Sequence, residues 1–226
     1  MNSIARRAAW VRVLPFALFI GLLALRGQAQ HWLPEGWDAR WIYVAQVALV
    51  AAVLLGFRRD YGELVRQLAP DTRQTLVAVA VGVIVFALWI TLDAPWMVIG
   101  EPTASFTPVD ERGGIDWALV AFRIVGTALV VPVMEELFWR SFLMRWVDDA
   151  RFERVPPGAV SMKAITVSTF LFVLAHTQWL AAAIAGLAYA LLYIRTGRLW
   201  MAIVAHAVTN AALAAWVVAT RQWQYW

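Results

Sequence analysis

The chain contains no cysteine, and only 15% of its 226 residues are charged. The lack of cysteine excludes disulfides and thiolate chemistry and leaves the redox compartment undetermined. With 62% hydrophobic residues, the chain is far too apolar for a soluble domain of this length, because too little polar surface remains to cover a core. The composition therefore predicts an integral membrane protein.

The excess of positive charge is small and scattered. The 19 lysines and arginines outnumber the 15 acidic residues, and the sequence pI is near 10.0. The basic residues stand in short runs between apolar segments, as expected of signals that set membrane topology. We therefore expect no binding of nucleic acid.

Long apolar runs make up most of the chain. A hydrocarbon core about 30 Å thick requires roughly 20 apolar residues per helix, so a chain of this length holds about six to eight spans. The pattern predicts seven helices, with a tight turn at "HTQW" between the fifth and sixth: 12–25, 41–57, 75–92, 117–138, 164–180, 181–195 and 199–219. The predicted fold class is all-α, a polytopic membrane helix bundle with residues 1–226 as one domain.

The N-terminal stretch resembles a signal peptide, because basic residues precede an apolar run. However, Arg26 follows the run and no clean A-x-A cleavage site precedes the next segment. We expect the first helix to be retained.

The basic residues also orient the chain in the cell membrane. They gather before the first predicted span and after the second, fourth and sixth, whereas the connection at 93–116 is acidic. Loops rich in lysine and arginine stay in the cytoplasm. This rule predicts a cytoplasmic N-terminus and a C-terminus outside.

Charged and polar side chains nevertheless occur inside the apolar segments, where they usually mark a site or a pathway. Three clusters stand out: "EELFWR" at 135–140, "FLFVLAH" ending at His176, and "HAVTN" at 206–210. Each contains a pair four residues apart, which a helix places on one face. The pairs are Glu136 with Arg140, Phe172 with His176, and His206 with Asn210.

Helix rise places these clusters at comparable depths. At 1.5 Å per residue, His206 lies about 10 Å above the cytoplasmic start of its segment and His176 roughly 18 Å above the start of its own. Glu135 lies within a few turns of the cytoplasmic end of the fourth segment. We expect these side chains to meet in one polar cavity open to the cytoplasm.

A structural role explains part of this set. Glu136 and Arg140 form a buried ion pair on this interpretation, and a histidine in a bundle often serves only as an interhelical hydrogen-bonder. Glu135 remains without a charged neighbour one turn away. An unpaired carboxylate suits a general base, and two histidines with an amide supply groups that activate water and donate to an oxyanion.

The order Glu-Glu-x-x-x-Arg, Phe-x-x-x-His, His-x-x-x-Asn resembles the CPBP intramembrane glutamic endopeptidases, which include the Ras-converting CAAX prenyl endoproteases and the bacterial Abi proteins. The motifs are separated by 41 residues from Glu135 to His176 and by 30 from His176 to His206. The similarity covers residues 117–215, the predicted catalytic core, and includes "YIRTGRLWMAIVAHAVTN". A weaker resemblance links the chain to members found beside exosortase-type sorting systems.

The resemblance implies a helical bundle around a cavity and hydrolysis of a peptide bond in a membrane-associated or lipidated protein. Membrane lipid and such a substrate are the expected partners. The implied roles are a general base at Glu135 assisted by His176, oxyanion donors at His206 and Asn210, and structural support from Glu136, Arg140 and Phe172.

Other functions remain open at this point. One carboxylate and two histidines also permit a zinc hydrolase, but the chain lacks an H-E-x-x-H motif and the resemblance favours a reaction without metal, so no cofactor is expected. A membrane scaffold or immunity-type module has no need for this complete polar set. A transporter more often shows two related halves with broken helices, and no such repeat is evident.

Overall fold

The computed structural model describes residues 3–28, 33–34, 37–65, 71–100, 106–110 and 112–226. These residues form helices and connections without a β-strand; one isolated antiparallel bridge joins Val109 and Ile115. The all-α class predicted from composition is confirmed.

Five helical stretches are long and apolar enough to cross a membrane: Arg6–Gln28 within α1 (Ser3–Gln28), α4 (Thr72–Trp89), the continuous helix Trp117–Trp146, α9 (Trp179–Thr196) and α10 (Leu199–Thr220). Two shorter apolar helices complete the set, α2 (Trp41–Gly56) and α8 (Met162–Leu174). These stretches overlap the seven predicted segments, and the architecture is a polytopic membrane bundle. A single helical turn, α3 (Gly62–Val65), precedes α4.

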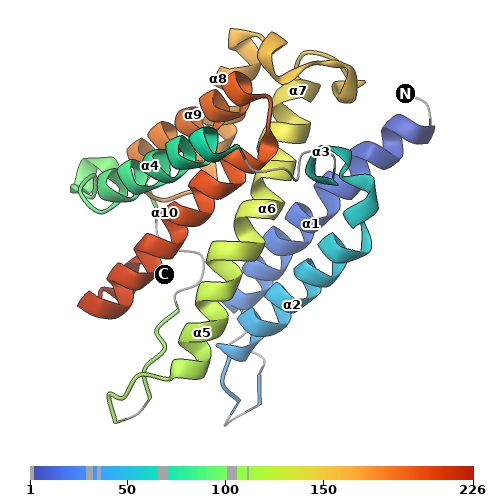
Figure 1. Ribbon diagram of the computed structural model, residues 1–226. Coiled ribbons are helices and arrows are strands. Elements are labelled where there is room, and N and C mark those ends of the chain that lie inside the picture. The colour runs from blue at the N-terminus through green and yellow to red at the C-terminus, as the bar shows by residue number, and fades with distance from the viewer. Residues whose placement is uncertain (1–2, 29–32, 35–36, 66–70, 101–105, 111) are drawn as a thin grey trace.

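The helix Trp117–Trp146 runs through the middle of the bundle (Figure 1). It comprises α5 (Trp117–Val125), α6 (Val131–Glu136) and α7 (Met144–Trp146), separated by π-helical segments at Gly126–Val130 and Leu137–Leu143. Helices α1 and α2 pack together beside it, while α10 packs against α4 and α9 (Figure 1). Helices α6 and α10, which carry residues of the first and third motifs, are in direct contact.

The fourth span was predicted to end at residue 138, and this boundary is wrong. The helix continues to Trp146 and buries Arg140 and Arg145, which the charge pattern assigned to a cytoplasmic loop. The helix extends because both guanidinium groups find partners inside the bundle. Arg145, for example, donates to the carbonyl of Val155 and to the hydroxyl of Tyr193.

The fifth span was predicted to reach residue 180, but α8 ends at Leu174 and leaves His176 in the turn before α9. The histidine itself helps to end the helix. Its backbone N–H donates to the carbonyl of Val173, three residues back, and its ring Nδ1 bonds to the carbonyl of Phe172. Such 3₁₀-type bonds satisfy the last carbonyls of a helix.

Glycine allows α4 and α10 to approach closely. A Cβ atom on Gly82 would lie 2.5 Å from the carbonyl oxygen of Ala205 and 2.8 Å from Cβ of Val208. The hydroxyl of Thr209 also bonds to the Gly82 carbonyl, at 2.9 Å. This contact holds the segment of α10 that carries the third motif against α4.

We therefore expect Gly82→Ala to destabilise the protein by about 1–3 kcal/mol, the usual cost of overpacking. Thermal unfolding of the detergent-solubilised protein measures the effect. Gly21→Ala is the matched control, because nothing lies within 4 Å of a Cβ added at Gly21. Equal stability of the two variants would contradict the close packing of α4 on α10.

Candidate active site

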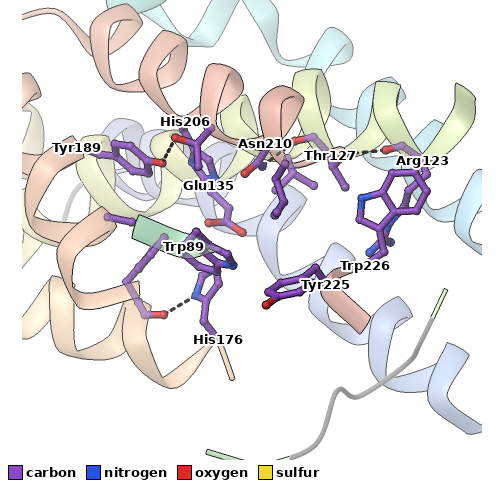
Figure 2. A pocket seen from close by; sticks show the side chains of 15 residues that line it. Trp89, Arg123, Thr127, Glu135, His176, Tyr189, His206, Asn210, Tyr225 and Trp226 are labelled. Atoms are coloured by element: carbon purple, nitrogen blue, oxygen red, sulfur yellow. Dashed lines mark hydrogen bonds between the residues drawn. The ribbon is translucent and has the colours of Figure 1, made fainter. Parts of the chain in front are cut away.

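A cavity of about 220 Å³ lies between the central helix, α8, α9 and α10. Its walls include Glu135, His176, His206 and Asn210, which approach one another from three parts of the chain (Figure 2). The structure thus brings together the four residues that the motifs suggested. Phe172 also lines the cavity.

The two adjacent glutamates face different surroundings. Successive helical residues are rotated by about 100°, so Glu135 lines the cavity while Glu136 is directed into packed protein, with 0% of its surface exposed. The Oε2 atom of Glu135 is buried, and among the described residues no donor bonds to this carboxylate. Of the two glutamates, Glu135 is therefore the one whose carboxylate faces the cavity.

The carboxylate of Glu136 is compensated by two partners. Its Oε1 atom accepts from Nη1 of Arg140 at 3.0 Å and from Nδ1 of His206 at 2.8 Å. Arg140 donates a further bond to the carbonyl of Gly186 on α9. The cluster therefore connects the central helix with both α9 and α10.

The ring of His206 is fixed in position and tautomer. A carboxylate accepts hydrogen bonds, so Nδ1 carries the proton donated to Glu136, and Nε2 is the nitrogen left for the cavity. Tyr189 stacks on the imidazole with ring centroids 4.9 Å apart, and its hydroxyl donates to Thr209. Carboxylate and aromatic ring together orient His206.

His176 is held in the same manner by a different partner. Its Nδ1 lies 2.8 Å from the carbonyl oxygen of Phe172, which can only accept, so the neutral ring keeps Nε2 as an acceptor. The imidazole contacts Phe172 and Trp89, with ring centroids 4.3 and 5.7 Å away. This state suits a group that receives a hydrogen bond from water.

Asn210 is positioned by an irregularity in the central helix. In the π-helical register, the N–H of Val131 bonds to the carbonyl of Gly126, and the next residue would bond to the carbonyl of Thr127. That residue is Pro132, which has no N–H. Instead Nδ2 of Asn210 donates to the Thr127 carbonyl at 2.8 Å, which leaves its second N–H for another acceptor.

Aromatic faces support the buried cation behind the cavity. The guanidinium carbon of Arg140 lies 4.6 Å from the ring centre of Phe172 and 5.4 Å from that of Tyr189. Cation–π contacts of this kind stabilise a desolvated charge. Phe172 thereby contacts both Arg140 and His176.

Several cavity residues were missed by the motif analysis. Tyr189, Trp89, Thr127, Tyr225 and Trp226 all line the cavity (Figure 2), yet none carries a distinctive spacing. Burial and the hydrogen bond to Asp93 raise the pKa of Tyr225 to about 12, so this phenol stays a neutral donor. Only tertiary structure identifies these residues.

The cavity holds one carboxylate and two histidines, the set that would also permit a zinc hydrolase. Among the residues that the structure describes, however, no three His, Cys, Asp or Glu side chains converge as a metal cluster. The bond from Nδ1 of His206 to Glu136 leaves Nε2 for the cavity, and Glu135 is the only carboxylate lining the cavity within the described part of the chain. The described side chains therefore show no preformed zinc site.

The position of the cavity bears on the expected orientation of the N-terminus and on the side from which the cavity is expected to open. Its walls include the last residue of α4 and the residues that follow α8 and α10. In a seven-span chain, these helix ends lie on the side opposite to the N-terminus. With seven spans, a cytoplasmic N-terminus would place these helix ends on the non-cytoplasmic side.

Comparison with known proteins agrees with the motifs. Residues 117–212 match the family model described as type II CAAX prenyl endopeptidase Rce1-like. No curated protein and no solved structure matches the chain. The matched segment contains the central helix and every residue of the three motifs.

The Glu136 cluster predicts a strong effect of removing one partner. Arg140→Met leaves a buried carboxylate without its cation, and we expect a loss of about 3–5 kcal/mol of stability. The double variant Glu136→Gln with Arg140→Met lacks both charges and should regain much of that loss in thermal unfolding. Arg195→Met, at an exposed position of α9, is the control. A double variant no more stable than Arg140→Met would contradict the inference that Arg140 neutralises the buried carboxylate of Glu136.

Proposed function

We propose that the protein is an intramembrane endopeptidase in which Glu135 activates the attacking water, and the match of residues 117–212 to the CAAX protease family model supports this proposal. The observation that carries this proposal is the buried Glu135 carboxylate, which lines the cavity and receives no hydrogen bond from the described residues. The substrate class is a membrane-associated or lipidated protein.

The proposed reaction begins with proton transfer from water to Glu135. The resulting hydroxide attacks the carbonyl carbon of the scissile peptide bond, and the carbonyl oxygen becomes an oxyanion. His176 accepts a hydrogen bond from the same water through Nε2, which orients it toward the carbonyl. Glu135 then gives its proton to the amide nitrogen as the C–N bond breaks.

The oxyanion requires donors on the other side of the cavity. The second N–H of Asn210 supplies one, because Thr127 holds only the first. His206 supplies the other when Nε2 is protonated, and the resulting imidazolium is stabilised by the carboxylate of Glu136. Fixed donors of this kind stabilise the transition state more than the substrate.

Glu136 and Arg140 act as positioning residues in this scheme. Glu136 holds His206 through Nδ1, and Arg140 neutralises Glu136. Neither needs to contact the substrate.

The direct test is Glu135→Gln, which preserves size and removes the base. We expect proteolysis to fall about 10²–10⁴-fold, the usual contribution of a general base, while the thermal stability stays close to that of the native protein. Mass spectrometry of membranes from cells with either form would detect the cleaved substrate. Glu153→Gln, which alters an exposed carboxylate, is the matched control. Undiminished cleavage by the Glu135→Gln protein would overturn the proposal.

A reaction without metal predicts resistance to chelators. Because Glu135 supplies the base and Asn210 with His206 the oxyanion donors, activity of the purified protein should persist in excess EDTA or 1,10-phenanthroline. Metal analysis of the same sample provides the control. Stoichiometric zinc, with activity lost on its removal and restored on its return, would favour the zinc-dependent mechanism instead.

A further inference from the structure

The cavity is surrounded by helix ends from one side of the bundle. Its rim, defined here as Trp89, Arg123, His176, Tyr225 and Trp226, contains the last residue of α4, a residue in the second turn of α5 and residues that follow α8 and α10. Figure 2 shows Trp89, His176 and Tyr225 lying around one side of the Glu135 carboxylate. All rim positions belong to the end of the bundle where α5 and α9 begin.

The opposite end of the bundle carries the positive charge. It contains the start of α1, the connections between α2 and α4 and between α7 and α8, and the turn between α9 and α10. Its described basic residues near the helix ends and in the connections are Arg6, Arg7, Arg58, Arg59, Arg73, Arg151, Arg154, Lys163, Arg195 and Arg198. Six described acidic residues share these connections: Asp60, Glu63, Asp71, Asp148, Asp149 and Glu153. The described connections at the rim end hold three basic residues, Arg40, Arg112 and Arg221, against the acidic Asp38, Asp93, Asp110 and Asp116.

A separate cavity lies at the basic end, and it does not include the active-site residues. Its volume is about 420 Å³, and its walls include Arg12, Glu63, Arg145 and Tyr193. Between the two cavities the central helix is tightly packed, since Leu137, Arg140 and Met144 are each at most 1% exposed. The two cavities share no lining residue.

Charge asymmetry of this kind places the basic end in the cytoplasm. We propose that the Glu135 cavity opens on the non-cytoplasmic side of the membrane. The peptide bond to be cleaved then belongs to an exported protein, or to one anchored in the outer leaflet, whose susceptible segment lies outside the cytoplasm. The choice of substrate rests on the proposed function; the direction of opening rests on the fold and the charges alone.

The rim also indicates which segment of such a substrate fits. Trp89, Tyr225 and Trp226 present aromatic rings, and Tyr225 is held in place by a bond to Asp93 at 2.7 Å. Aromatic side chains settle where apolar and polar surroundings meet. An apolar stretch next to a membrane anchor is therefore the chemistry that the rim accepts.

The absence of cysteine makes the test direct, because each introduced thiol is the only one in the chain. Three variants measure from which side of the membrane three places can be reached. They are Thr91→Cys at the rim end, Glu153→Cys at the basic end, and Leu213→Cys in the cavity wall. Spheroplasts are treated with a membrane-impermeant maleimide, before or after permeabilisation, and inside-out vesicles are treated in parallel. None of the three positions belongs to the proposed catalytic set.

We expect Thr91→Cys and Leu213→Cys to react in intact spheroplasts and to lose that reaction in sealed inside-out vesicles. Glu153→Cys should show the reverse. Any other pattern overturns the proposal. Two examples are labelling of Leu213→Cys only in inside-out vesicles, and no labelling of Thr91→Cys or Leu213→Cys in spheroplasts before permeabilisation. The native protein, which has no thiol, gives the background, and a thermal melt of each variant verifies folding.

The labelling result does not depend on catalysis. If the Glu135→Gln protein remained active while the rim end labelled from outside, the proposed mechanism would fail and the direction of opening would stand. If Glu135 proved essential while the rim end was labelled only from the cytoplasm, the proposed mechanism would stand and the proposed direction of opening would fail. The two proposals are thus tested separately.

Discussion

The arrangement of the site depends on one buried carboxylate oxygen, Oε1 of Glu136, which accepts from both Arg140 and His206. A charge in fully packed surroundings such as those of Glu136, away from any cavity, persists only when it is paired and hydrogen-bonded. This requirement fixes the rotation of the central helix, because Glu136 must face α9 and α10. Glu135, the next residue, is then directed into the cavity. The ion pair therefore determines which of the two glutamates lines the cavity.

Local rules of sequence predicted the parts of this site that arise within one helix. Residues four apart share a helical face, which is why the pairing of Glu136 with Arg140 was foreseeable. The bond from His206 to Glu136 joins residues 70 positions apart, and the stacking of Tyr189 on His206 depends on how α9 packs against α10. Contacts of this range are set by tertiary packing, and no spacing in the sequence encodes them.

The boundaries that differed from expectation have a common physical cause. Arginine in an apolar pattern normally marks a loop, yet Arg140 and Arg145 lie inside because carboxylate, carbonyl and hydroxyl groups from other helices receive their N–H groups. His176 was expected within a helix and instead ends one. The π-helical segment Gly126–Val130 escapes prediction for a similar reason: the Thr127 carbonyl that Pro132 leaves unbonded is satisfied by Asn210, a residue of α10.

Depth within the membrane is a poor guide to the direction from which a site is reached. Counting residues from the cytoplasmic start of a helix places His206 closer to that surface, and this count favoured a cavity open to the cytoplasm. Access is decided by where side chains leave space. Here the layer beneath Glu135 is filled, with Leu137 at 1% and Met144 at 0% exposure, whereas the ends of α4, α8 and α10 lie around the cavity. The shortness of α8, which ends at Leu174, brings His176 to the rim of the cavity.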